Sequence, residues 1–415
     1  MQGARASLDN SHRQGVLSLP FDLLIYIIAL IAEGCLPIYK RSELDPLIEA
    51  LSKVCRAFRN AVLHTVSLWT KIDERYCLRD DFMDLMARSR SAPLHIDISL
   101  SKSDWEQVLS RLVPYRDRWQ KLTIRSCQIR LEDIMRAFPD VEFSCLKRID
   151  VVFRIGEVDY DKFFVQWKFP GLDFLELSDA VPPLSCLLTL REFHLLITKL
   201  DTDDKAEALL GRLMDFLDCT RTLEVLRLDA AGIDTTMPEN LRVVELPNIK
   251  ELVISNFDVS DSDYHDWFVP PAMSRFIRSI RVPNVQEYRI YLRIEGENEA
   301  IPEWIASFAS SPDILHSVTY LYVSSDFSFD NATTVDFFAL LPNLRELIVD
   351  VPAFGENLLY SDSRLNLERL RSLSLMRETK EFLQTGPKLI FNQLSANPHN
   401  FAVELDPGLY GYPSD

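Results

Sequence analysis

The sequence predicts an α/β protein in which a small all-helical N-terminal module is followed by an irregular solenoid with a curved parallel sheet. Residues 16–76 contain three segments whose apolar residues recur at helical spacing. After residue 76 one short apolar pattern returns about ten times, and helical-looking segments separate several of its copies. The order of a helical segment and then a repeated apolar pattern predicts this fold class.

Composition limits the possible functions. Of the 415 residues, 47% are hydrophobic and 26% are charged, a balance typical of folded proteins. The formal net charge is −17, which disfavours a general nucleic-acid binder because such proteins neutralise phosphates. Only 12 residues are glycine, and the sequence contains none of the glycine-rich loops that hold nucleotide phosphates. We therefore expect no nucleic-acid partner and no cofactor.

Three helices are expected in the N-terminal module, after a polar and flexible tail over residues 1–15. They cover residues 20–32, 45–54 and 55–64. The first of these helices is apolar on more than one face, so we expect it to be either deeply buried or packed against a partner protein. Its run over residues 23–32 could also imitate the apolar part of a signal peptide. However, Pro20 and Asp22 fit the first turn of a helix, and the run is too short to span a bilayer.

The solenoid is predicted from the pattern Leu-x-x-Leu-x-Leu, with Ile, Val or Phe as substitutes. Its second positions are Leu122, Ile149, Leu175, Phe193, Leu226, Leu252, Tyr288, Leu321, Leu347 and Leu373. Several spacings between copies fall in the range of leucine-rich repeats. Such repeats turn their leucines inward and stack, so that their strands form one curved parallel sheet. A conventional α/β domain explains the alternation of strands and helices, but not the recurrence of one template.

The solenoid is expected to span residues 77–393, with residues 394–415 as a C-terminal cap or tail. Helices are expected between strands at residues 206–217, 301–309 and 334–341. The repeats lack the asparagine that usually follows the third leucine, which indicates loops of varying length. Between residues 258 and 317 two templates compete for one strand, Ile277-Ile280-Val282 and Val285-Tyr288-Ile290.

Three ordered blocks in the N-terminal module resemble the F-box. Residues 19–24 read Leu-Pro-Phe-Asp-Leu-Leu, residues 51–61 read Leu-Ser-Lys-Val-Cys-Arg-Ala-Phe-Arg-Asn-Ala, and Leu68-Trp69 closes the motif. The following segment, residues 82–94, is similar to the joint found after the F-box in many fungal members. Two features depart from the family: Phe58 replaces the usual Trp, and residues 33–49 are longer than in a compact F-box.

The resemblance implies the substrate-recognition subunit of an SCF-type ubiquitin ligase, located in the cytoplasm or nucleus. The F-box would bind a Skp-family adaptor and, through it, cullin and RING subunits. The residues that match the motif are the candidates for adaptor contact or for holding the interface helices: Leu19, Pro20, Leu23, Leu24, Ile27, Leu51, Val54, Cys55, Phe58, Leu68 and Trp69. Some of them, especially Val54, Ile27 and Trp69, could instead form only the core of the module.

The residues between the inward leucines should line the concave face of the solenoid, where a target protein would bind. The candidates combine charge and aromatic bulk, which indicates a protein or peptide ligand. They are Glu176, His194, Arg227, Arg289, Tyr291, Tyr320 and Tyr322. Charge also divides along the chain, because residues 1–76 carry 9 basic and 8 acidic residues, which leaves 36 − 54 = −18 for the remainder.

Catalytic and metal-binding motifs find no support in the sequence. The seven cysteines are scattered and never in C-x-x-C spacing, so they read as buried thiols in a reducing compartment and not as a disulfide framework or a zinc site. The seven histidines form no H-E-x-x-H pair. We therefore expect a non-catalytic receptor or adaptor without a metal. The main alternative is a recognition solenoid whose helical module is only a cap, unconnected to ubiquitin transfer; a secreted repeat protein and an enzyme are weaker alternatives.

Overall fold

The computed structural model describes most of the N-terminal half and the strands of the C-terminal half. The described residues are 19–35, 41–100, 104–126, 129–153, 160–183, 189–197, 203–229, 241–255, 279–294, 316–325, 341–350, 372–376 and 402–405. The chain divides into two units, residues 1–172 and 173–415. Each unit is described by itself below.

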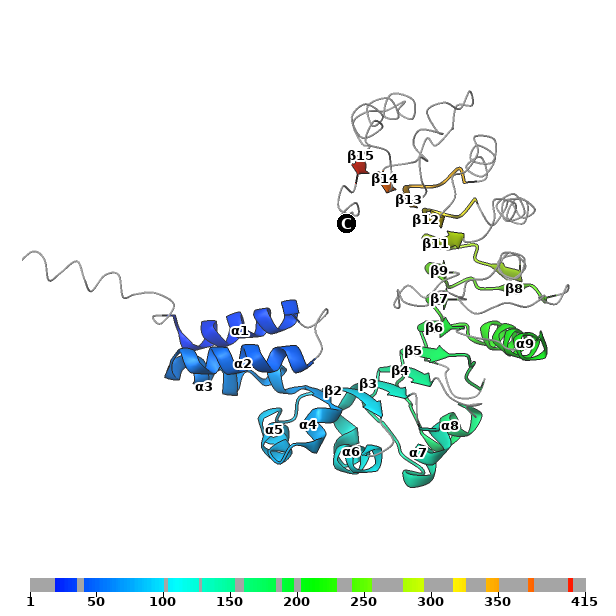
Figure 1. Cartoon of the computed structure of the whole chain (residues 1–415). Helices are drawn as coiled ribbons and strands as arrows, with labels where there is room; N and C mark the ends of the chain where they lie inside the picture. Colours follow the sequence, from blue (N-terminus) through cyan, green and yellow to red (C-terminus); the bar gives the residue numbers. More distant parts are fainter. Residues whose placement is uncertain are drawn as a thin grey trace, which may run out of the picture. The chain divides into compact units, whose positions relative to one another are not determined.

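The first unit begins with the expected three helices. They are α1 (Phe21–Cys35), α2 (Arg41–Val54) and α3 (Arg56–His64), which lie side by side (Figure 1). Cys55 adopts an extended conformation between α2 and α3 and so separates the two helices. A short 3-10 helix, η3 (Val66–Trp69), follows α3. Thr65 joins them, and its hydroxyl donates a hydrogen bond of 2.8 Å to the carbonyl of Ala61.

Four parallel strands follow in the order β1-β2-β3-β4 within this unit. The strands are β1 (Lys71–Asp73), β2 (Leu94–Leu100), β3 (Trp119–Ser126) and β4 (Arg148–Phe153). Short helices alternate with them, as Figure 1 shows: α4 (Glu74–Leu78), α5 (Phe82–Arg88), α6 (Trp105–Leu112), the 3-10 helix η4 (Val113–Arg118), α7 (Leu131–Ala137) and α8 (Tyr160–Gln166). Strand β1 starts two residues after the end of η3, so the segment expected to be the helical module, residues 16–76, includes the first strand and ends within α4.

The core of the first unit lies between the strands and these helices. Alternate strand residues such as Leu122, Ile124 and Ile149 are fully buried, as the repeat template predicts. Beside them is a cluster of aromatic side chains, in which the ring of Phe143 lies 5.1 Å from the rings of both Trp119 and Trp167. Large rings in van der Waals contact contribute much of the hydrophobic stabilisation of such a core.

The second unit continues the repeat pattern. Its parallel strands are β5 (Phe174–Ser178), β6 (Glu192–Leu196), β7 (Val225–Asp229), β9 (Glu251–Ser255), β11 (Glu287–Ile294), β12 (Tyr320–Ser325), β13 (Glu346–Asp350), β14 (Ser372–Met376) and β15 (Ala402–Leu405), paired in that order. The helix expected at residues 206–217 is α9 (Asp203–Cys219). The α/β fold class predicted from the sequence, with N-terminal helices before a leucine-rich-repeat-like solenoid, is confirmed.

Strand pairing decides between the two competing templates. Tyr288 and Ile290 lie in β11 of the main sheet and pair with Leu252 and Ile254. The other template contributes β10 (Ile280–Arg281), which pairs with β8 (Val244–Glu245) in a separate two-stranded sheet. The helix expected at residues 301–309 lies outside the described residues, as does the helix expected at 334–341 except for its last residue.

One register differs from the sequence template. The template aligns Tyr288 with Leu321, but in the structure Leu321 pairs with Ile290. Tyr288 is instead bonded to Thr319, whose hydroxyl accepts a hydrogen bond of 3.2 Å from the Tyr288 amide. The shift is two residues, so the inward and outward faces of both strands are preserved.

Candidate protein-binding surfaces

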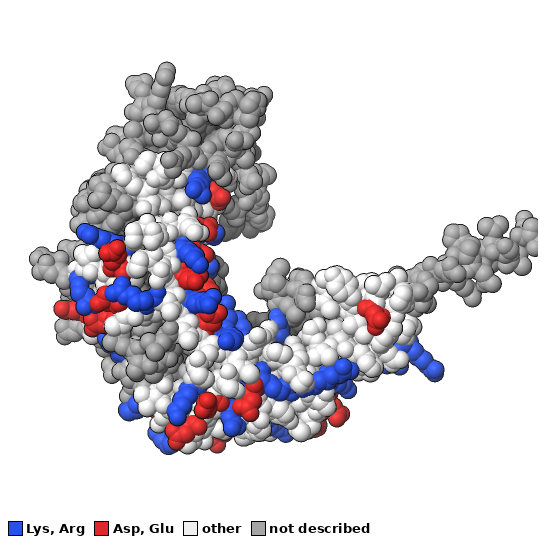
Figure 2. All heavy atoms as spheres, turned by 180° about the vertical axis from the view of Figure 1, so that it is seen from behind, with Lys and Arg blue, Asp and Glu red and all other residues white. Residues whose placement is uncertain are grey.

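Helix α1 exposes an apolar surface that its own fold does not cover. Leu24 and Ile28 are 2% and 1% exposed and pack inward. The rest of the helix carries six exposed large apolar residues, here called the α1 patch: Phe21, Leu23, Tyr26, Ile27, Leu30 and Ile31, with Tyr26 exposed to 60%. Val54 and Leu63 add exposed apolar side chains from α2 and α3. Figure 2 shows this part of the chain, next to the grey N-terminal residues, with few charged side chains on the visible face.

The motif residues divide into three groups by burial. Four are exposed: Pro20, Leu23, Ile27 and Val54. Four are half-buried: Leu19, Leu51, Cys55 and Phe58. Three are buried: Leu24, Leu68 and Trp69. The structure therefore keeps Ile27 and Val54 available for contact although they could have been core residues, and it places Trp69 in the core.

Trp69 holds the helical module against the start of the sheet. Its indole Nε1–H donates to the carbonyl of Val62 in α3 over 3.2 Å, and the guanidinium of Arg88 from α5 lies 5.0 Å from its ring centre. One side chain thus links three helices, and it is only 5% exposed.

Motif comparison did not single out four residues of the α1 patch, namely Phe21, Tyr26, Leu30 and Ile31. A signal was available, because the apolar residues of α1 form two stripes at helical spacing. The stripe of Leu24 and Ile28 fills the core, and the second stripe, which includes Tyr26 and Leu30, remains exposed.

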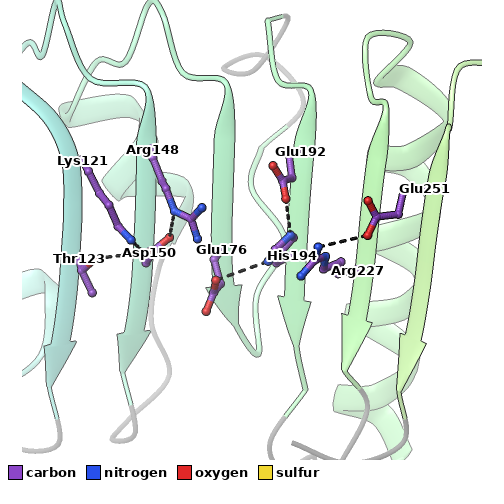
Figure 3. A network of polar contacts seen from close by, with 9 residues as sticks. All are labelled: Lys121, Thr123, Arg148, Asp150, Glu176, Glu192, His194, Arg227 and Glu251. Carbon is purple, nitrogen blue, oxygen red and sulfur yellow. Dashed lines mark hydrogen bonds and ion pairs between the residues drawn. The ribbon is translucent and has the colours of Figure 1, made fainter. Parts of the chain in front are cut away.

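A polar cluster centred on Asp150 lies on the strands of the first unit (Figure 3). This carboxylate accepts a hydrogen bond of 3.0 Å from the Thr123 hydroxyl. It also pairs with Lys121 at 3.0 Å and Arg148 at 3.2 Å. Because the carboxylate of Asp150 is only 10% exposed and has three donors, its charge is compensated inside the chain.

The strands of the second unit carry a second polar network, separately visible in Figure 3. His194 Nε2 lies 2.9 Å from Glu192, and its Nδ1 lies 3.5 Å from Glu176 on the neighbouring strand. Burial lowers the pKa of His194, but the hydrogen bonds to Glu176 and Glu192 outweigh it, so the pKa is raised overall. Farther along, Arg227 pairs with Glu251 at 3.1 Å.

Three tyrosines form an aromatic cluster on β11 and β12. The ring of Tyr291 lies 5.3 Å from that of Tyr320 and 6.0 Å from that of Tyr322. The guanidinium of Arg289 lies 5.5 Å from the ring centre of Tyr320 and is held by Glu287, with Nε 2.8 Å from the carboxylate. Burial, followed by the nearby Tyr291, raises the pKa of Tyr320, so the Tyr320 hydroxyl keeps its proton at neutral pH.

All seven residues predicted for target binding lie on one face of the second unit. The strand register places Glu176, His194 and Arg227 in one row, and Arg289 continues it through Val253. The two-residue register shift between β11 and β12 changes which residues pair at the end of this row. The template aligned Arg289 with Tyr322, but Arg289 pairs with Tyr320, and Tyr291 pairs with Tyr322.

The described part of the chain shows no cluster of three or more His, Cys, Asp or Glu side chains able to hold a metal ion. Within the same ranges, no helix has the length and apolar character needed to cross a membrane. The described cysteines Cys55, Cys77, Cys145 and Cys219 are free thiols. Burial raises the pKa of Cys77, which removes the thiolate that a nucleophile requires.

Comparison with known proteins gives no family for the chain. No family model matches it, and no curated protein matches it. It is similar to the solved structure of a Bacteroides fragilis protein, with a TM-score of 0.35 and 13% identity over 77% of this chain and 76% of that one. It is also similar to the TLR13–ssRNA13 complex (TM-score 0.34, 13% identity, 72% of this chain, 37% of that one) and to the yeast Rad7–Elc1 complex (TM-score 0.36, 13% identity, 96% and 95%). Similarities this low carry no argument about function.

Proposed function

We propose that the protein is a non-catalytic receptor subunit whose helical module binds a Skp-family adaptor of an SCF-type ubiquitin ligase and whose solenoid binds a target protein. Cullin and RING subunits would join through the adaptor. The mechanism is proximity, because a receptor that holds a target beside the transfer machinery raises its effective concentration. The protein would act inside the cell, and its own residues would make and break no bonds.

The observation that carries this proposal is the α1 patch. Of the twelve exposed large apolar side chains among the described residues, six lie on this one helix. Concentrated apolar surface of this kind is typical of a helix that packs against a partner. The patch also includes the motif residues Leu23 and Ile27. Val54, the valine of the second motif block, is exposed as well.

A second role for the module is supported by a different contact. Strand β1 pairs in parallel with β2 directly after η3, and Trp69 ties α3 and α5 together around this junction. Solenoids need atypical units at their ends to cover the first repeat. The module therefore also serves as a cap, and it is the exposed α1 patch that argues for a partner in addition.

The test is a pull-down of a Skp-family adaptor from the same organism by the full chain. The variant carries Tyr26→Asp and Leu30→Asp in the α1 patch. The matched control carries Met83→Asp and Val165→Asp, two apolar residues that are 64% and 67% exposed on other helices. We expect the parent and the control to bind, and the α1 variant to lose binding by at least about tenfold, as for hot-spot residues.

Circular dichroism of the variants checks that each is folded. Failure of the well-folded parent to bind any Skp-family adaptor would contradict the proposal and leave the module as a cap alone. Binding by both variants would place the adaptor on another surface. If the parent binds, reconstitution with cullin and RING subunits measures whether ubiquitin reaches the chain or a captured target.

A further inference from the structure

The outward strand face of the second unit combines carboxylates with an apolar, aromatic platform. Among side chains that the structure describes on β5–β13, its charged members are six carboxylates and two guanidiniums: Glu176, Glu192, Asp229, Glu251, Glu287 and Glu346 against Arg227 and Arg289. The sum is 2 − 6 = −4 with His194 neutral, and −3 with His194 protonated. In Figure 3 a helix lies behind the strands, and Glu176, His194 and Arg227 lie on the other face of the sheet.

Both guanidiniums on this face are already engaged by the chain itself. Arg227 pairs with Glu251 at 3.1 Å, and Arg289 is held by Glu287. Neither arginine is therefore a ready partner for a phosphate or an acidic side chain. The two arginines pair with two of the six carboxylates, so the net charge of the face stays negative. A negative face favours a cationic partner.

The aromatic platform consists of Tyr291, Tyr322 and Ile348, which lie on the same face of the sheet, on β11, β12 and β13. Tyr291 pairs with Tyr322 in register, and Tyr322 pairs with Ile348 on β13. These three side chains are half-buried, so part of each is open to a partner. Tyrosine rings accept both apolar side chains and cations. Arg289 above Tyr320 at 5.5 Å shows that a cation occupies such a ring face within the chain.

We propose that this face binds an extended, cationic protein segment in which lysine or arginine alternates with apolar residues. Its basic side chains would pair with carboxylates such as Glu346, which is exposed at the rim of the platform, and its apolar side chains would pack on Tyr291, Tyr322 and Ile348. Successive side chains of an extended segment point to opposite sides of its backbone. A segment lying between the row that contains Glu346 and the row of Tyr291, Tyr322 and Ile348 would therefore direct its basic side chains to one row and its apolar side chains to the other. The inference rests on the proposed role of the solenoid in target binding, and it names the class of target.

The test uses the full chain and fluorescein-labelled peptides, without any adaptor. The probe is a decapeptide of alternating lysine and leucine, and its analogues replace lysine by glutamate or leucine by serine. Fluorescence anisotropy should show that the lysine–leucine peptide binds and that both analogues bind at least about tenfold more weakly, because charge and apolar contact are both required.

Two variants locate the binding, because an acidic protein attracts any cationic peptide to some extent. Glu346→Lys should weaken binding of the peptide about fivefold or more, whereas the same charge change at an exposed position of α6, Glu106→Lys, should change it less than about twofold. Tyr322→Ala should weaken binding about tenfold. Equal effects of Glu346→Lys and Glu106→Lys, or preference for the glutamate peptide, would overturn the proposal, as would the absence of any binding.

This outcome is separate from that of the adaptor pull-down. A chain that binds the cationic peptide but no adaptor would keep this inference and lose the ligase connection. A chain that binds the adaptor but discriminates against the cationic peptide would keep the receptor role and lose the assignment of the target class.

Discussion

His194 is the residue whose charge state most directly affects the strand face. It is enclosed by Glu176, Glu192 and the guanidinium of Arg227, and the last of these opposes its protonation. The two carboxylates prevail, so the pKa of His194 lies above its usual 6.5. Linkage then requires that the stabilisation by protonated His194 is complete below about pH 6.5 and is lost as the pH rises through the raised pKa.

We therefore predict that His194→Gln costs stability at acidic pH and progressively less as the pH rises from about 6.5. The difference in free energy of unfolding between parent and variant, measured by urea denaturation across this range, checks the sign. His95 is the internal control. Burial, and to a smaller extent Lys71 and Lys121, lowers the pKa of His95, against the hydrogen bond that its ring donates to Gln120 Oε1, so His95→Gln should show the opposite trend. A difference for His194→Gln that grows with pH would contradict the prediction.

Among the elements, η3 is the one on which the helical module depends. Trp69 of η3 is 5% exposed and donates its indole N–H to Val62. We predict that Trp69→Phe, which keeps an aromatic ring but removes the donor, lowers the free energy of unfolding by about 1–2 kcal/mol. Trp69→Ala should lower it by about 3–5 kcal/mol, because it also opens a cavity.

Thermal and urea unfolding followed by circular dichroism measure both changes. If the two substitutions cost the same, the aromatic ring would contribute nothing through packing, and the link between η3, α3 and α5 would have to lie elsewhere. Loss of adaptor binding by Trp69→Phe without loss of stability would instead place Trp69 at the interface.

The elements also show what could be predicted from the sequence and what could not. Strands with the full leucine template, such as β5 to β7, were predicted because each buries three apolar positions at fixed spacing. Strand β2 was missed because Leu94, Ile96 and Ile98 alternate without the template's first gap, and β1 has only three residues. The shift between β11 and β12 is accompanied by two hydrogen bonds between Tyr288 and Thr319, which no apolar pattern predicts.

The candidate surfaces were predictable to different degrees for a similar reason. Strand alternation fixes which residues face outward, so the seven target-binding candidates could be placed on one face. Burial within a bundle of helices depends on how the helices pack. Val54 was therefore assigned to the core as readily as to the surface, yet it is 58% exposed, whereas the motif residue Leu24 is 2% exposed.

At the scale of the whole molecule, the two proposed surfaces should respond differently to salt. The α1 patch is apolar and lies in a segment with a net charge of +1, whereas the remainder of the chain, including the acidic strand face, carries −18. Salt screens interactions between exposed charges and leaves burial of apolar surface almost unaffected. We predict that raising NaCl from about 0.05 M to about 0.5 M weakens binding of the lysine–leucine peptide about tenfold or more and changes adaptor binding by less than about threefold.

Titrations of both partners in the same buffers provide the comparison, and the Glu346→Lys variant supplies the control, because its peptide binding should depend less steeply on salt. Salt-independent peptide binding would mean that the apolar platform alone holds the segment and that the carboxylates around it contribute nothing. Strongly salt-dependent adaptor binding would move the adaptor away from the α1 patch and onto charged surface, since the exposed side chains of that patch, from Phe21 to Ile31, are predominantly apolar.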